Sequence, residues 1–250
     1  LKSIIEAYRK IRNTIRWMLG VLSNYDQSWI YDYEDLDELE KYMLHSLTRL
    51  QEDVQDAYEA YDYRKVTTLL VNYINLDLSA FYFDIRKDSL YCDPYSSEKR
   101  KSSLYVINII FKTISKLYAP ILSFTMDEVW KNYPFAQDRS VHLSRFELVN
   151  DKWSNDNINS KWDNLRKLRK TVTAALEIKR RDKEIGSSLE AGIQIYLNDK
   201  DILASVSDID LAEICITSSF ELINKKPDSR CFVLDEEPEI GVIVHIAEGK

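Results

Sequence analysis

Glycine is scarce in this sequence and unevenly placed. The 250 residues include five glycines, and only Gly20 precedes position 186. Because glycine interrupts helices, a chain that almost lacks it before Gly186 is expected to be mainly helical there. The remaining glycines accompany a change in apolar pattern, which indicates a different architecture after Gly186.

Two further absences exclude whole classes of protein. No apolar run approaches the ~20 residues of a membrane-spanning helix, and the charged start does not resemble a signal peptide. Cys92, Cys215 and Cys231 are far apart and include no Cys-x-x-Cys pair. They predict neither a disulfide framework nor a zinc site. We therefore expect a cytoplasmic protein with no membrane partner and no cofactor in this chain.

Catalytic motifs are also missing. The sequence contains no glycine-rich phosphate loop and no nucleophile elbow. Paired carboxylates such as Asp35 and Asp37 lie in acidic runs, where a solvated surface is the ordinary interpretation. His142 has no Asp or Cys partner at motif spacing, so a structural role is expected for it. The chain alone should catalyse no reaction.

Helical periodicity dominates what is present. Apolar residues recur every three or four positions, the spacing that places them on one face of a helix. This pattern predicts helices over residues 1–22, 35–61, 63–91, 98–118 and 161–183. Thr125 and Glu128 have the spacing of a capping box, which predicts a shorter helix beginning there. The fold class expected is mainly α, an antiparallel helical bundle followed by a small α+β module.

The module is indicated by alternating apolar residues. Ile193–Leu197 and Val242–Ile246 alternate as half-buried strands do. Shorter strands are expected at 214–217, 220–223 and 231–234, a helix over 199–206 capped by Asn198, and turns at 226–228 and 236–238. The predicted organisation is a helical bundle over residues 1–158, a basic connecting helix over 159–186 and the α+β module over 187–250.

One helical stretch mixes charge into an apolar surface. In Asp77–Pro94, DLSAFYFDIRKDSLYCDP, the side chains of Leu78, Phe81 and Ile85 share one face, and bulky residues occupy the others. A charge buried there needs a partner or a ligand. A central bundle helix with internal ion pairs is the simpler interpretation, and a ligand site is the alternative.

Positive charge is concentrated in two places. The net charge is −7, yet residues 161–183 hold nine basic and three acidic residues. Arg9, Arg12 and Arg16 form a second stripe along the first helix. A solvated surface explains such stripes in many proteins, but basic helices also suit a rod of phosphates.

Several motifs resemble one family, in the same order along the chain. They are the stretch Asp77–Pro94 and the runs YRKIRNTIRWMLG, APILSFTMDEVWKNYP, SVHL and LRKTVTAALEIKRRDKEIGSSLEA. Together they resemble the anticodon-binding region of isoleucyl-tRNA synthetases, class I aminoacyl-tRNA synthetases, with Ser123 where proline is usual. The resemblance covers essentially the whole chain. It is confined to the region downstream of the catalytic core, since the HIGH-type and KMSKS-type motifs do not occur.

This resemblance implies a fragment of an isoleucine–tRNA ligase that recognises the anticodon arm. The implied partners are isoleucine-accepting tRNA and the protein's own catalytic and editing domains, the former binding ATP and isoleucine; DNA is not expected. A helical protein-interaction scaffold, or the equivalent domain of a valyl- or leucyl-type synthetase, is the alternative. The residues expected to contact tRNA are Arg9, Arg12, Arg16, Lys87, Arg166, Arg169, Lys170, Arg180, Arg181 and Lys183.

The resemblance also bears on the end of the chain. In many bacterial isoleucyl enzymes, the strand resembling Gly241–Ile246 leads into a four-cysteine zinc module. We therefore expect the native protein to continue past Lys250, with zinc possible in that further module. A lineage whose enzyme ends here is the alternative.

Overall fold

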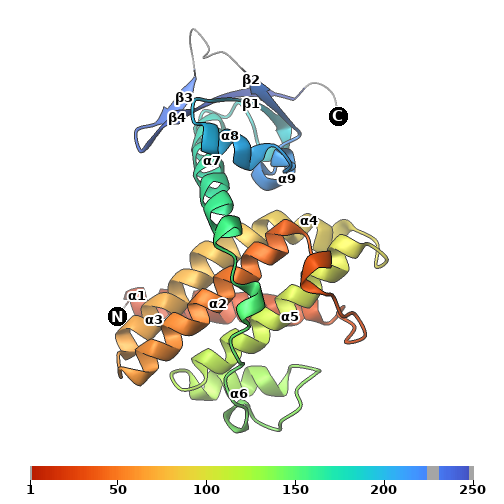
Figure 1. Ribbon diagram of the computed structural model, residues 1–250, viewed down its shortest axis with the longest axis vertical. Helices are drawn as coiled ribbons and strands as arrows, with labels where there is room; N and C mark the ends of the chain where they lie inside the picture. Colours follow the sequence, from red (N-terminus) through yellow and green to blue (C-terminus); the bar gives the residue numbers. More distant parts are fainter. Residues whose placement is uncertain (1, 224–230, 248–250) are drawn as a thin grey trace. The chain divides into compact units, whose positions relative to one another are not determined.

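A computed structural model describes residues 2–223 and 231–247 (Figure 1). The chain forms two compact units, Leu1–Asn155 (unit 1) and Asp156–Lys250 (unit 2). The expected fold class is confirmed, because unit 1 is helical and unit 2 contains a small sheet. The domain limits at 158 and 186 stay predictions. Across the described residues, no helix combines the length and apolar character that crossing a membrane requires.

Unit 1 is a helical bundle centred on α5 (Glu98–Tyr118), which contacts α1, α2, α4 and α6. Ile107, Phe111 and Ile114 of α5 are fully buried, as its apolar spacing predicts. The other elements are α1 (Lys2–Leu22), η1 (Tyr33–Asp35), α2 (Glu38–Glu59), α3 (Tyr63–Asn72), η2 (Tyr73–Tyr82), α4 (Phe83–Cys92), α6 (Ser123–Lys131), η3 (Val141–Leu143) and η4 (Asp151–Trp153).

The helix expected over residues 63–91 has an internal change of winding. α3, η2 and α4 follow one another without a break, and η2 is a π-helix. Leu78, Phe81 and Ile85 are buried as expected. A π-helix bonds residue i to i+5 and is rare, and such stretches are frequent at functional sites.

The capping box expected at Thr125 is wrong. α6 begins two residues earlier, at Ser123, and its N-terminal residues receive no side-chain cap. The Thr125 hydroxyl lies 3.0 Å from the Tyr8 hydroxyl, and Glu128 pairs with Arg12. Both side chains of the supposed box therefore contact α1 instead of their own helix.

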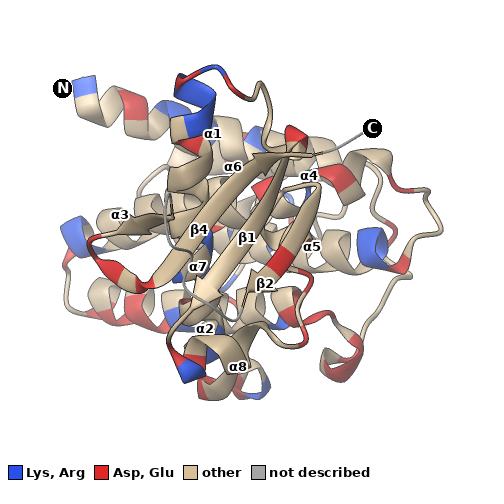
Figure 2. Cartoon of the chain, turned by 90° about the horizontal axis from the view of Figure 1, so that it is seen from above, with Lys and Arg blue, Asp and Glu red and all other residues tan. Residues whose placement is uncertain are grey.

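Unit 2 is a four-stranded sheet in the order β2-β1-β4-β3, with α7, α8 and α9 on one face (Figures 1 and 2). β1 pairs parallel with β2 and antiparallel with β4, and β3 pairs antiparallel with β4. Ile193, Ile195 and Val242 are buried. The elements are α7 (Asp156–Arg181), η5 (Ser188–Glu190), β1 (Ala191–Leu197), α8 (Lys200–Val206), α9 (Leu211–Cys215), β2 (Ser219–Ile223), β3 (Phe232–Leu234) and β4 (Glu237–Ile246).

Some local expectations for unit 2 are wrong. Residues 214–217 do not form a strand, because Asp210 caps α9 by accepting hydrogen bonds from the amides of Ala212 and Glu213, and Ile216 then ends it with a φ of 57°. Asp199, not Asn198, caps α8. The turn expected at 236–238 lies at residues 235–236, and 226–228 fall outside the described residues.

Candidate nucleic-acid interface

The basic residues of α1 differ in how their charge is used. α1 carries five basic residues and one acidic residue, and Figure 2 shows part of this charge near the N-terminus of the helix. The Arg9 guanidinium lies 3.1 Å from the Glu6 carboxylate. Arg12 makes two hydrogen bonds to Glu128, both of 3.0 Å. Arg16 is exposed and makes no hydrogen bond or ion pair with any residue in the described ranges. Among Arg9, Arg12 and Arg16, Arg16 is therefore the residue whose charge has no partner in the described structure.

Arg16 lines a cavity of about 500 Å³, here called the arginine groove. Arg12, Gly20, Glu128 and Asn132 also line it. Nothing lies within 4 Å of the position that a Cβ of Gly20 would occupy, so the helix surface beside Arg16 is bare. The hydrogen-bonded pair with Arg12 lowers the pKa of Glu128, which keeps that carboxylate charged. Arg12 is thus neutralised, and Arg16 is available to an anion.

A second cavity, of about 360 Å³, lies on the neighbouring side of α1 and is here called the aromatic pocket. Asn13 and Trp17 of α1 line it together with Phe83 and Lys87 of α4. The Lys87 ammonium lies 2.9 Å from the Asp84 carboxylate. Lys87, expected to contact tRNA, is therefore an exposed, paired residue beside this pocket.

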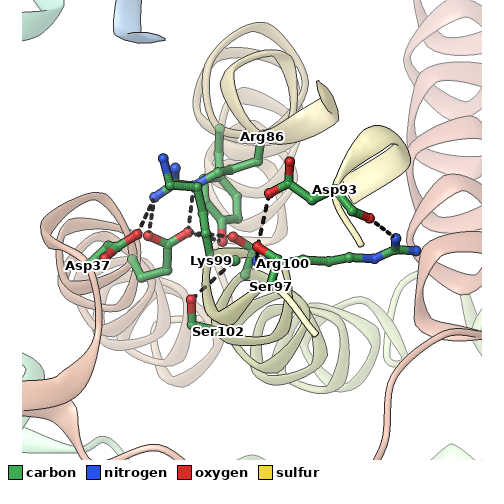
Figure 3. Close-up of polar contacts among 10 residues, drawn as sticks. Asp37, Arg86, Asp93, Ser97, Lys99, Arg100 and Ser102 are labelled. Atoms are coloured by element: carbon green, nitrogen blue, oxygen red, sulfur yellow. Dashed lines mark hydrogen bonds and ion pairs between the residues drawn. The ribbon is translucent and has the colours of Figure 1, made fainter. Parts of the chain in front are cut away.

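The buried charge in the central stretch belongs to Arg86 (Figure 3). Its side chain is 3% exposed and pairs with Glu40, which is 0% exposed. Arg86 donates to both carboxylate oxygens of Glu40, at 2.8 and 2.5 Å, and Asp37 lies 3.3 Å away. Tyr82 and Ser103 donate to the same carboxylate at 3.0 and 2.9 Å. Internal ion pairing is thus the correct interpretation of Arg86, and this charge is not available to a ligand.

The network also affects the Tyr82 hydroxyl. Burial, followed by the negative charge of Glu40, raises the pKa of Tyr82 well above its ordinary value. The phenol therefore stays protonated and donates to Glu40. Three of the four hydrogen bonds go to Oε1 and one to Oε2, so both oxygens of the buried carboxylate are hydrogen-bonded.

A second buried arginine follows the same stretch (Figure 3). Arg100 is 7% exposed, donates to the Asp93 carbonyl at 2.5 Å and lies 4.3 Å from the centroid of the Tyr95 ring. Ser97 caps α5 and donates to the Asp93 carboxylate at 3.0 Å. In the sequence, Arg100 stands among charged residues, so it is expected to lie at the surface. Only Ser97, a residue type favoured at helix N-caps, indicates that the turn before α5 is ordered.

Arg166, Arg169 and Lys170, expected to contact tRNA, lie near the middle of α7, and their exposure differs. Arg169 donates through Nε to the Ile214 carbonyl at 2.8 Å, which ties α9 to α7. Lys170 is exposed and pairs with Glu236 in the turn before β4. Arg166 is half-buried. Arg169 is therefore a structural residue, and its replacement would disturb unit 2 itself.

At the end of α7 the basic residues are exposed. Arg180 pairs with Glu177, and Arg181 lies 3.3 Å from Asp182. Lys183 follows the helix with a φ of 60°. Positive charge in a last turn is favoured by the helix dipole, and such exposed pairs contribute only about 0–1 kcal/mol. These charges can exchange their carboxylates for other anions at little cost.

Metal ligands do not gather in the part of the chain that the structure describes, where no group of three His, Cys, Asp or Glu side chains could hold an ion. Burial raises the pKa of the Cys215 thiol to about 12. Cys215 is therefore a neutral core residue near physiological pH, not a thiolate ligand.

Comparison with known proteins identifies the family of this chain. The family model described as the anticodon-binding domain of tRNA ligase matches residues 40–197. Proteins named isoleucine–tRNA ligase are 47% identical in Bradyrhizobium diazoefficiens and Agrobacterium fabrum and 46% identical in Rhodopseudomonas palustris, each over 100% of this chain. The chain spans about a quarter of the length of these curated relatives. It belongs to the family of anticodon-binding domains of tRNA ligases.

Proposed function

We propose that this chain binds the anticodon arm of isoleucine-accepting tRNA as part of an isoleucine–tRNA ligase. The observation that carries the proposal is similarity along the whole chain to proteins of that name. In the complete protein, the tRNA acceptor end would reach a catalytic domain that uses ATP and isoleucine. The catalytic and editing domains of the same protein are then its other partners.

The charges of α1 support this function. An anticodon stem presents a rod of phosphates, and its loop presents unstacked bases. Arg16 offers an open guanidinium beside the arginine groove, and Arg9 offers one held only by an exposed pair. Phosphate can replace Glu6 at Arg9 because an exposed pair of this kind is weak. Lys170, Arg180 and Arg181 supply comparable exposed charges on α7.

The test is tRNA binding by the full chain as a function of salt. We expect binding to an isoleucine tRNA transcript that weakens steeply as salt rises. Replacing Arg9, Arg12 and Arg16 by Glu should lower affinity and reduce the salt slope by about one unit per lost phosphate contact. A second variant replaces Lys170, Arg180 and Arg181 by Glu. It keeps Arg169, which has a structural role.

A matched control removes the same number of charges elsewhere in unit 1. Arg49, Arg64 and Lys65 are exposed on α2 and α3, outside both cavities. Their replacement by Glu should change binding much less than the α1 variant does. Binding that ignores salt, or no binding to any tRNA, would favour the protein-interaction scaffold. Equal binding to a transcript with an altered anticodon would contradict anticodon recognition.

A further inference from the structure

The aromatic pocket has the size of a small-molecule site. It measures about 360 Å³, within the roughly 300–1,000 Å³ typical of such sites. Trp17 and Phe83 form one wall, with ring centroids 4.2 Å apart and planes inclined by 31°. Tyr91, a third aromatic lining residue, is 63% exposed. Trp17 is only half-buried, so a planar ring can pack against it without opening the core.

The polar groups of the pocket can read the edge of a planar ring. Asn13 is exposed and makes no hydrogen bond with the described part of the chain, so its amide can both donate and accept. Asp84 and Lys87 pair at 2.9 Å beside it. An aromatic platform combined with a free amide is the chemistry that binds an unstacked nucleobase.

The arginine groove lies on the adjacent face of α1. Asn13 and Arg16, and likewise Trp17 and Gly20, are three positions apart, which makes each pair surface neighbours on a helix, with Cβ positions about 5–6 Å apart. Asn13 and Trp17 line the pocket, whereas Arg16 and Gly20 line the groove. Because Gly20 has no side chain, no bulky group stands between Trp17 and the groove at that level of the helix. A base in the pocket would have its phosphate near Arg16.

Residues of η2 and α4 in the central stretch complete the lining of the pocket. η2 contributes Ser79, whose hydroxyl lies 3.1 Å from that of Thr14. Phe83 directly follows the last π-helical residue. The π-helix therefore contributes Ser79 to the lining and leads directly into Phe83, in keeping with the frequent use of such stretches at functional sites.

We propose that the aromatic pocket holds one unstacked base of the anticodon loop. The base stacks on Trp17, the Asn13 amide bonds to its edge, and Arg16 receives the adjoining phosphate. This inference rests on the proposed function, and it names the pocket in which one base of the anticodon loop is bound.

The test combines changes in the protein with changes in the RNA. The full chain is titrated with the anticodon stem-loop of isoleucine tRNA, in which each loop nucleotide in turn is made abasic. Trp17→Leu should weaken binding roughly 5- to 150-fold, the range for one stacked base. One abasic position should weaken binding to the native chain by a similar factor but have little further effect on Trp17→Leu. Trp29→Leu, a half-buried tryptophan outside the pocket, is the matched control and should bind as the native chain does.

Asn13→Ala keeps the test valid if Trp17→Leu fails to fold, because the exposed Asn13 side chain makes no hydrogen bond with the described residues. It should reduce discrimination among the four bases at that same loop position and leave binding of the abasic stem-loop unchanged. Native binding that neither variant alters, with no abasic position coupled to Trp17, would overturn the pocket assignment and leave the proposed function standing. Failure of the native chain to bind both stem-loop and whole tRNA would overturn the proposed function.

Discussion

Removing Arg86 should destabilise unit 1 severely. In Arg86→Met the Glu40 carboxylate, 0% exposed, loses its cationic partner but keeps its burial. Breaking a buried ion pair in this way costs about 3–5 kcal/mol. A domain's free energy of unfolding is typically about 5–15 kcal/mol, so the variant should lose a large part of its stability.

A compensated variant tests the reason for this loss. Tyr82 and Ser103 also donate to Glu40, so removing Arg86 and Glu40 together would leave two buried hydroxyls unsatisfied. The combination Arg86→Met, Glu40→Leu, Tyr82→Phe and Ser103→Ala removes Glu40 and every donor to it, and of the network leaves only the half-exposed Asp37. Because well-packed apolar replacements of a buried pair are often neutral, it should unfold within about 2 kcal/mol of the native chain.

Urea unfolding followed by circular dichroism measures both variants, and hydrogen exchange of α2 and α5 peptides reports unit 1 separately. Lys87→Met, which removes an exposed pair on the same helix, is the control and should change stability by less than about 1 kcal/mol. A loss below about 1 kcal/mol in Arg86→Met would refute the reasoning. So would a compensated variant less stable than Arg86→Met.

Four other predictions concern chemistry and packing. Exposed Cys92 should react with iodoacetamide in the native chain at pH 8, whereas Cys215 should react only after unfolding, as peptide mass spectrometry would show. Since burial raises the Cys215 pKa to about 12, its contribution to stability should be complete below the unfolded thiol's pKa of about 8.5 and be lost as pH rises towards 12, which pH-dependent urea unfolding would detect. Gly192→Ala would place a Cβ 2.3 Å from His245 Nε2 and should destabilise unit 2 by about 1–3 kcal/mol, a loss that His245→Ala should partly restore in thermal melts. The chain should show no isoleucine-dependent exchange of pyrophosphate into ATP, and exchange by pure protein would contradict this expectation.

The helices were predictable because their signal is local. Apolar spacing in residues 98–118 gave the buried face of α5 directly. The π-helix was not predictable, since i→i+5 bonding leaves Leu78, Phe81 and Ile85 at spacings that an α-helix also explains. The strand predicted at 214–217 is wrong because Ile214 and Cys215 belong to a short helix that Asp210 caps.

The sequence predicted which residue types make up the candidate site. It did not predict which of their charges are free to bind RNA. Arg16 and Arg169 look alike in sequence, yet one is open and the other donates to the Ile214 carbonyl. Arg86 pairs with a glutamate 46 positions away, and no local pattern encodes that distance. Which arginines remain for RNA depends on such long-range partners. The Asn13 amide, which sequence reasoning did not select, gained significance only from the pocket around it.

Glu128 affects which anions can reach Arg12. Its carboxylate accepts hydrogen bonds from both terminal nitrogens of Arg12, Nη1 and Nη2, as a phosphate would. If the chain binds tRNA as proposed, Glu128 competes with RNA phosphates for Arg12. An anion must displace the Glu128 carboxylate before it can bind there. A polyanion held by its other contacts can do so, whereas a stray phosphate gains too little from one contact. Glu128 therefore lowers the affinity of Arg12 for isolated anions and, on the proposed function, favours an RNA that makes further contacts with the protein.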